Sequence, residues 1–184
     1  MKRVYNFNAG PSPMPLEVLE AMKNDLTDFK GTGMGITEIS HRSKEFQDML
    51  DETKALLREL MHLDDDYEIV FIQGGGTMQF LMTAYNFLHT RAAYADTGVW
   101  AHKARNSAAF FVEAYDANSA ADRNYSYIPD TYEVKPGTDY LYLCANNTIY
   151  GTEYWKFPKV NVPLICDMSS DILSRNIDFG QFDM

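Results

Sequence analysis

Cysteine is scarce in this sequence of 184 residues, which contains only Cys144 and Cys166. The two lie too far apart for the short spacing of a metal clip or a redox pair. Each lies inside an apolar run, which is the usual setting of a buried thiol, and reduced thiols are typical of cytosolic proteins. We therefore predict that both cysteines are buried and reduced.

Basic residues are also few. The sequence has 16 lysines and arginines and 26 acidic residues, which gives a net charge of −10 at pH 7. Binding to DNA or to an anionic membrane needs clustered positive charge. No apolar run approaches the roughly 20 residues that span a bilayer, and the N-terminus lacks the apolar core of a signal peptide. These absences argue against nucleic acid and membranes as partners and predict a cytoplasmic protein.

What the sequence does contain is an alternation of short apolar runs with segments of helical pattern. The expected strands are 69–72, 93–95, 109–112, 140–143 and 163–166, and the expected helices among them are 78–88 and 100–107. Almost continuous apolar strands are typical of a sheet that is buried on both faces. The pattern therefore predicts an α/β fold. Residues 118–137 are polar and carry no assignable pattern.

The N-terminal part has a different organisation. Pro11 and Pro13 exclude a helix interior there, and residues 1–15 are expected to be extended. Apolar residues at helical spacing predict one helix from Pro15 to about Lys30 and a second from Ser43 to about His62. The consecutive acids Asp64–Asp66 are interpreted as a solvated turn, because three neighbouring carboxylates do not converge on one metal ion.

The first candidate binding feature is the segment Gly74-Gly75-Gly76-Thr77, which follows an expected strand and opens an expected helix. Glycines let a ligand approach the backbone, and the free N–H groups at a helix start attract anions. The segment matches neither a Walker A loop nor a dinucleotide fingerprint. It predicts a phosphate cradle, and a tight turn without a ligand is the alternative.

Asp167 and Trp100 each follow an expected strand, at the place where α/β sheets bind ligands. The Asp167 carboxylate suits a metal ligand, a member of a catalytic triad, a partner for a protonated ring nitrogen, or a helix N-cap. The Trp100 ring suits stacking on a planar cofactor, although a core position is more common for this residue type.

His41 and Arg42 lie in the loop before the second expected helix. Such a pair is usually solvated, yet the guanidinium fork is suited to a carboxylate or a phosphate. Thr148 lies in Asn146-Asn147-Thr148, which matches a glycosylation sequon by pattern and is interpreted as a chance match.

Six motifs occur in an order and at spacings that closely resemble the phosphoserine aminotransferases, which are class-V, fold-type-I pyridoxal-phosphate enzymes of serine biosynthesis. The motifs are Asn6-Phe7-Asn8-Ala9-Gly10-Pro11, Ser40-His41-Arg42-Ser43, Gly74-Gly75-Gly76-Thr77-Met78-Gln79-Phe80, Thr97-Gly98-Val99-Trp100, Asn147-Thr148-Ile149-Tyr150-Gly151-Thr152 and Asp167-Met168-Ser169-Ser170. The likeness runs over essentially the whole chain.

The resemblance implies a fold-type-I large domain, with a mixed, mostly parallel sheet and helices on both faces. Residues 1–15 would be an arm of the small domain, and residues 16–184 the N-terminal part of the large domain that binds pyridoxal phosphate. The rest of the large domain and the C-terminal small domain would lie beyond residue 184. A homodimer is expected for the family.

The resemblance also implies a role for each candidate residue at the cofactor. Gly76 and Thr77 would bind the phosphate of pyridoxal 5′-phosphate, and Trp100 would stack on its ring. Thr148 would bond to the region of the 3-oxygen, and Asp167 would pair with the protonated ring nitrogen. No metal ion is implied.

His41 and Arg42 would bind the anionic end of the substrate, and the Arg42 side chain is expected to matter for the substrate rather than for the cofactor. The implied reaction transfers an amino group from L-glutamate to 3-phosphohydroxypyruvate, and it gives O-phospho-L-serine and 2-oxoglutarate.

The Schiff-base lysine of the family has no counterpart in this sequence. In the family it follows the segment equivalent to 179–184, and here no lysine occurs after Lys159. The resemblance therefore implies an N-terminal fragment that contains no catalytic residue of its own and is inactive alone. The alternative is a non-catalytic remnant or complementing subunit that binds pyridoxal phosphate or a partner chain.

Overall fold

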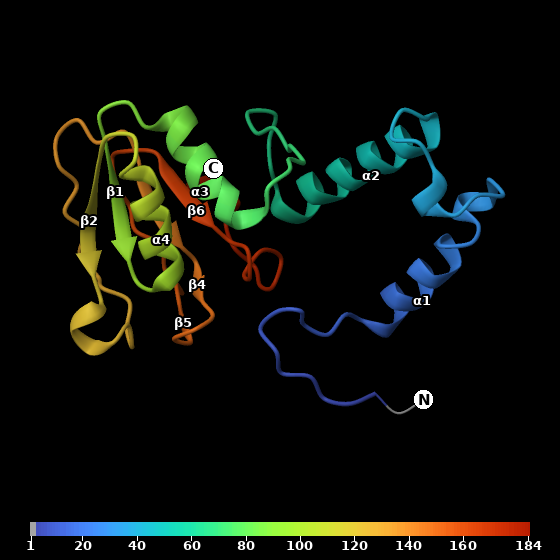
Figure 1. Cartoon of the computed structure of the whole chain (residues 1–184), viewed down its shortest axis with the longest axis horizontal. Helices are drawn as coiled ribbons and strands as arrows, with labels where there is room; N and C mark the ends of the chain where they lie inside the picture. The colour runs from blue at the N-terminus through green and yellow to red at the C-terminus, as the bar shows by residue number, and fades with distance from the viewer. Residues whose placement is uncertain (1–2) are drawn as a thin grey trace. The chain divides into compact units, whose positions relative to one another are not determined.

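A computed structural model describes residues 3–184, and it divides the chain into two compact units that join in sequence between Asp64 and Asp65 (Figure 1). From Arg3 to Pro15 the chain has no helix or strand, in agreement with the expected extended arm. The assignment of this arm to a separate small domain stays a prediction. None of the helices between residues 3 and 184 is long and apolar enough to cross a membrane.

The first unit contains helices α1 (Leu16–Asp25) and α2 (Lys44–Met61), with short 3₁₀ helices at Phe29–Gly31 and Ile36–Glu38. α2 begins as predicted, because the Ser43 hydroxyl accepts a hydrogen bond from the Phe46 N–H at 3.3 Å. α1 ends earlier than the predicted Lys30. The chain turns there because Phe29 is buried and its N–H donates to the Met34 carbonyl at 2.8 Å.

The second unit is built on a four-stranded parallel sheet in the order β2-β1-β3-β6. Its strands are β1 (Arg91–Asp96), β2 (Glu113–Ser119), β3 (Leu141–Cys144) and β6 (Leu164–Asp167), and its helices are α3 (Gly75–Phe87) and α4 (Val99–Ala108). The unit also contains a small antiparallel pair of strands, β4 (Asn146–Asn147) and β5 (Thr152–Glu153), and 3₁₀ helices at Ala121–Arg123 and Phe179–Gln181. This arrangement confirms the predicted α/β fold.

The core lies between the sheet and the two helices α3 and α4 (Figure 1). Alternate strand residues supply one side of it, and Tyr94 and Tyr142 pair in register on neighbouring strands. Phe80 and Ala84 supply the α3 side. The strand residues that alternate with these, such as Leu141 and Leu143, lie on the opposite face of the sheet and are also fully buried. Both faces of the sheet are therefore covered, as predicted.

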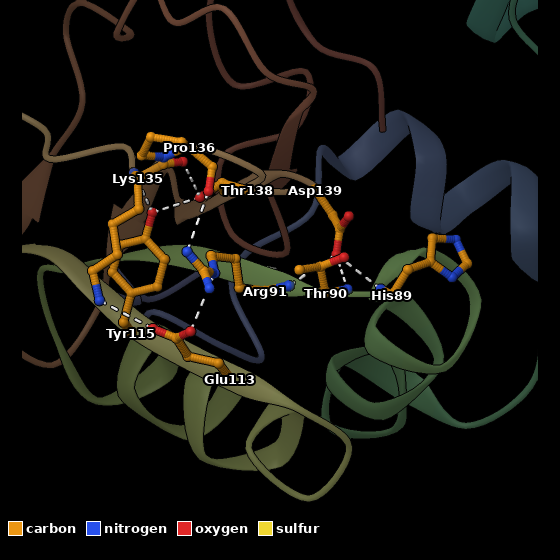
Figure 2. A network of polar contacts seen from close by, with 9 residues as sticks. All are labelled: His89, Thr90, Arg91, Glu113, Tyr115, Lys135, Pro136, Thr138 and Asp139. Atoms are coloured by element: carbon orange, nitrogen blue, oxygen red, sulfur yellow. Dashed lines mark hydrogen bonds and ion pairs between the residues drawn. The ribbon is translucent and has the colours of Figure 1, made fainter.

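The amino end of β1 is held by one carboxylate (Figure 2). Asp139 Oδ2 accepts hydrogen bonds from the backbone N–H groups of His89, Thr90 and Arg91 at 2.8, 2.6 and 3.1 Å. Burial alone would raise the pKa of Asp139, but the three bonds outweigh burial and lower it below its ordinary value. The bonds fix the start of β1 beside the start of β3.

A second group of polar contacts joins the start of β2 to the chain before β3 (Figure 2). The Glu113 carboxylate lies between the Arg91 guanidinium at 3.1 Å and the Lys135 ammonium at 3.0 Å. The hydroxyl groups of Tyr115 and Thr138 are 2.7 Å apart. Arg91 and Glu113 are also register partners, so these contacts fix the pairing of β1 with β2.

Two predicted strands are wrong. Residues 69–72 are extended but pair with no strand in the described part of the chain, and Val70, Phe71 and Ile72 are more than half exposed. A strand needs a neighbour to satisfy its N–H and C=O groups. Residues 109–112 form the turn after α4, and β2 begins only at Glu113.

The edge of the sheet at β6 is partly paired. Beside β6, the Asp183 N–H donates to the Leu164 carbonyl at 2.9 Å, and the Cys166 N–H donates to the Met184 carbonyl at 2.8 Å. The Asp183 carboxylate also accepts from the Leu164 N–H at 2.8 Å. The segment at 183–184 therefore lies along β6.

Candidate functional site

The candidate site lies at the carboxyl ends of the central strands. From β1 the chain crosses through α4 to β2 on one side, whereas β3 and β6 lie on the other side of β1. Such a change of direction leaves a crevice at the carboxyl edge where α/β proteins bind ligands. The segments that leave these strands carry Trp100, Thr148 and Asp167, as the sequence predicted.

The start of α3 has the backbone of an anion cradle. Gly74 and Gly75 have φ angles of 107° and 55°, which side chains disfavour, and a Cβ at Gly74 would lie 2.6 Å from the Met78 side chain. The helix then begins at Gly75, and N–H groups in a first helical turn lack partners within the helix. The exposed Thr77 adds a hydroxyl to this turn.

Ser169 lies between this helix start and Asp167. A Cβ placed at Gly76 would be 3.4 Å from Ser169 Oγ, an ordinary van der Waals contact. The same Oγ donates to Asp167 Oδ1 at 2.6 Å, and the Ser169 N–H donates to that oxygen at 3.0 Å. Gly76 and the Asp167 carboxylate thus both lie near one serine, which the sequence analysis did not single out.

Trp100 and Thr148 form a direct pair. The indole Nε1 donates to Thr148 Oγ1 at 3.2 Å, and the half-buried ring packs against the core. The Lys103 ammonium lies 4.8 Å from the centre of the Trp100 ring. The start of α4 is therefore tied to the turn after β4.

Asn147 supports this pair and was also missed as a candidate. Its buried amide accepts from Thr97 Oγ1 at 3.4 Å and donates to Thr152 Oγ1 at 3.1 Å. A Cβ at Gly98 would lie 2.7 Å from Asn147 Oδ1, so the β1–α4 turn closes tightly over the amide. The only sequence signal was the motif around Thr148, which indicates neither burial nor these partners.

The turn after β6 is joined to the segment after β3. The Ala145 N–H donates to the Asp167 carbonyl at 2.9 Å, and Asn146 Nδ2 donates to Ser170 Oγ at 3.1 Å. The backbone bond from Ala145 places the Asp167 turn beside the strand pair that carries Thr148. Five candidate residues, Gly76, Thr77, Trp100, Thr148 and Asp167, thus belong to segments that meet at one edge of the sheet.

Both cysteines are free. Cys144 is buried, and burial followed by the negative charge of Asp167 raises the pKa of its thiol to about 12. Burial also raises the pKa of Cys166, which is partly exposed. Both thiols therefore stay protonated at neutral pH and are poor nucleophiles.

His41 and Arg42 lie in the first unit, on the loop before α2. Both side chains are exposed, and the Arg42 N–H donates to Ser40 Oγ at 3.2 Å. Their role at a substrate stays a prediction.

The donor set at the sheet edge fits pyridoxal phosphate. A helix start with glycines at positive φ angles suits a phosphate, and the half-buried Asp167 carboxylate suits a protonated ring nitrogen. The Trp100 indole offers an aromatic face, and the Thr148 hydroxyl lies within hydrogen-bonding distance of it.

Comparison with known proteins finds phosphoserine aminotransferases among the similar sequences and structures. Phosphoserine aminotransferase of Bacteroides thetaiotaomicron is 46% identical over 178 residues, which are 97% of this chain and 50% of that protein. A solved phosphoserine aminotransferase, studied for radiation damage of its Schiff base, matches with a TM-score of 0.95 and 43% identity, over 99% of this chain and 52% of that one. The pyridoxal-phosphate-bound enzyme from Trichomonas vaginalis matches with a TM-score of 0.90 and 36% identity, over 98% of this chain and 52% of that one.

The chain spans about half the length of the curated relatives that it matches. The family model described as aminotransferase class-V matches residues 4–184, which is almost the entire sequence. This chain therefore belongs to the class-V aminotransferase family.

Proposed function

We propose that this chain takes part in the phosphoserine aminotransferase reaction, as the part that binds pyridoxal 5′-phosphate. The substrates would be L-glutamate and 3-phosphohydroxypyruvate, in a cytoplasmic homodimer. The observation that carries the proposal is that Ser169 Oγ bonds to Asp167 and lies 3.4 Å from the Cβ position of Gly76, because this proximity supports one site for the phosphate and for the ring nitrogen.

Each residue at the sheet edge then has one task. Gly76 and Thr77 donate hydrogen bonds to the phosphate, and the Trp100 ring covers one face of the pyridine. Thr148 bonds to the region of the 3-oxygen, and the Asp167 carboxylate holds the proton on the ring nitrogen. When bound, the protonated pyridine withdraws electrons from the carbon that loses a proton during amino transfer.

We propose that the lysine and the remaining substrate groups come from segments equivalent to the second half of the relatives. Lys103 lies over the Trp100 ring and matches no family lysine. The amino transfer itself would therefore require a second part.

The test uses the purified chain alone and the chain mixed with the C-terminal half of the Bacteroides thetaiotaomicron enzyme. Alone, the chain should bind pyridoxal 5′-phosphate without a covalent bond, and borohydride should link no single lysine to it. The mixture should transaminate glutamate. A single stoichiometrically labelled lysine in the chain alone, or an assembled mixture without activity, would contradict the proposal.

Arg42 provides a separate test of substrate binding. In the active mixture, Arg42→Ala should raise KM at least tenfold and leave the affinity for pyridoxal 5′-phosphate near normal, because its fork suits the anionic end of a substrate. The exposed Arg123 offers a matched control, since Arg123→Ala removes the same charge from the 3₁₀ helix after β2. Loss of cofactor with an unchanged KM would overturn the assignment.

A further inference from the structure

We infer that Ser169 is a positioning residue, which orients the Asp167 carboxylate so that Oδ2 is left for the ring nitrogen of pyridoxal phosphate. This inference rests on the proposed function and assigns a role to a residue outside the set of cofactor contacts proposed above.

Both hydrogen bonds from Ser169 end on the same carboxylate oxygen. Its N–H and its hydroxyl donate to Asp167 Oδ1 at 3.0 and 2.6 Å, whereas Asp167 Oδ2 accepts no hydrogen bond from the residues that the structure describes. The terminal torsion of an aspartate is broad and nearly two-fold. Two donors on one oxygen remove that freedom, and charge-assisted bonds are stronger than neutral ones. The second oxygen is therefore presented in one orientation.

The same hydroxyl also lies near the start of α3. Because Gly76 has no side chain, Ser169 Oγ lies at van der Waals distance from the position of a Cβ there. Ser169 thus sets the separation between the phosphate cradle and the carboxylate. A planar ligand that carries a phosphate and a ring nitrogen needs that separation to be fixed.

The turn that carries Ser169 is anchored independently of it. The buried Asp171 accepts from Arg175 at 2.7 Å and from Ser174 Oγ at 2.8 Å, and its N–H donates to the Met168 carbonyl at 3.0 Å. Removal of the exposed Ser169 hydroxyl therefore leaves the turn in place. Ser170 is a matched control, because its hydroxyl bonds to Asn146 and not to Asp167.

The experiment compares two ligands of the chain, pyridoxal 5′-phosphate and 1-deazapyridoxal 5′-phosphate, in which a carbon replaces the ring nitrogen. Ser169→Ala should weaken binding of pyridoxal 5′-phosphate about tenfold and leave binding of the deaza analogue unchanged. Ser169→Thr keeps the hydroxyl and should restore the affinity. Ser170→Ala should bind both ligands as the unaltered chain does. Far-ultraviolet circular dichroism confirms that each variant is folded.

The outcomes separate the inference from the proposed function. An unaltered chain that binds both ligands equally would refute the Asp167 contact, and with it this part of the proposed function and the inference. If the unaltered chain prefers pyridoxal 5′-phosphate, an equal loss of both ligands in Ser169→Ala, or no loss of either, would overturn the inference alone.

Discussion

At the scale of single residues, the strongest local anchor in the sheet is Asp139, whose carboxylate accepts three consecutive backbone N–H groups (Figure 2). It lies at the amino end of the strands, whereas the candidate site lies at their carboxyl ends. Stability and ligand binding are therefore supported by different residues, and a substitution at Asp139 tests stability alone.

Asp139→Asn should lower the free energy of unfolding by about 1–2 kcal/mol at neutral pH, because the neutral amide oxygen accepts the three hydrogen bonds more weakly than a carboxylate oxygen does. The folded state lowers the pKa of Asp139, so its contribution is present above the unfolded value of about 3.9 and is lost as the pH falls through the folded pKa. Urea unfolding of both proteins at a series of pH values measures the difference. It should be largest near neutrality and vanish in acid.

The control for this comparison is Asp130→Asn, which changes an exposed carboxylate in the same unit. It should leave the urea midpoint nearly unchanged at every pH. Equal midpoints for the Asp139→Asn variant and the unaltered chain near neutrality would contradict the assignment of Asp139 as an anchor.

At the scale of elements, the turn from β1 to α4 depends on the absence of a side chain. Gly98 has extended φ and ψ angles that any residue can adopt. A glycine is needed at this position only because a Cβ would clash with the nearby Asn147 amide. Gly98→Ala should destabilise the fold by about 1–3 kcal/mol through overpacking. Thermal or urea unfolding measures the loss.

A double variant distinguishes this steric cause from a general effect of alanine. Asn147→Ala should itself destabilise the chain, because it removes two buried hydrogen bonds, but it opens the space next to residue 98. In that background, Gly98→Ala should have a much smaller effect. Strict additivity of the two changes would show that the amide is not the obstacle.

Strands that contain an apolar run could be predicted from the sequence, and the strand without one could not. β1, β3 and β6 lie close to their predicted positions because both of their faces are buried. β2, with the sequence EAYDANS, is an edge strand with only one fully buried residue, so it has no apolar run. The run at 69–72 has the composition of a strand. Whether such a run becomes a strand depends on a neighbouring strand that can pair with it, and the local sequence does not reveal that neighbour.

The candidate site shows the same division. Gly76, Thr77, Trp100, Thr148 and Asp167 could be proposed as site residues because glycine freedom, strand ends and the order of the motifs can be read from the sequence. The supporting residues Ser169 and Asn147 act through side-chain hydrogen bonds across turns and between segments. Such bonds leave no periodic signal in the sequence, so only the structure reveals them.

At the scale of the whole molecule, the apolar segment Val70–Ile72 is a candidate site of self-association. Val70, Phe71 and Ile72 are 64%, 57% and 55% exposed, and exposed extended apolar segments favour pairing with other chains. We expect the chain alone to self-associate as its concentration rises. Phe71→Lys should reduce that association, as sedimentation velocity would measure.

The control is Thr131→Lys, which adds the same charge at an exposed polar position and should not change the association. A monodisperse monomer with one cooperative thermal transition, over the whole concentration range, would contradict this prediction.

The strand order also has a consequence for the route by which the chain folds. β1 pairs with β2 through the short α4 crossover, but it pairs with β3 only after the long irregular segment that follows β2 has closed. Closing a longer loop costs more entropy, so local pairings tend to form first. The Trp100–Thr148 bond joins the turn after β1 to the turn after β4. We therefore expect β1, α4 and β2 to form an early folding nucleus, and the candidate site to be assembled in a late step, when β3 docks.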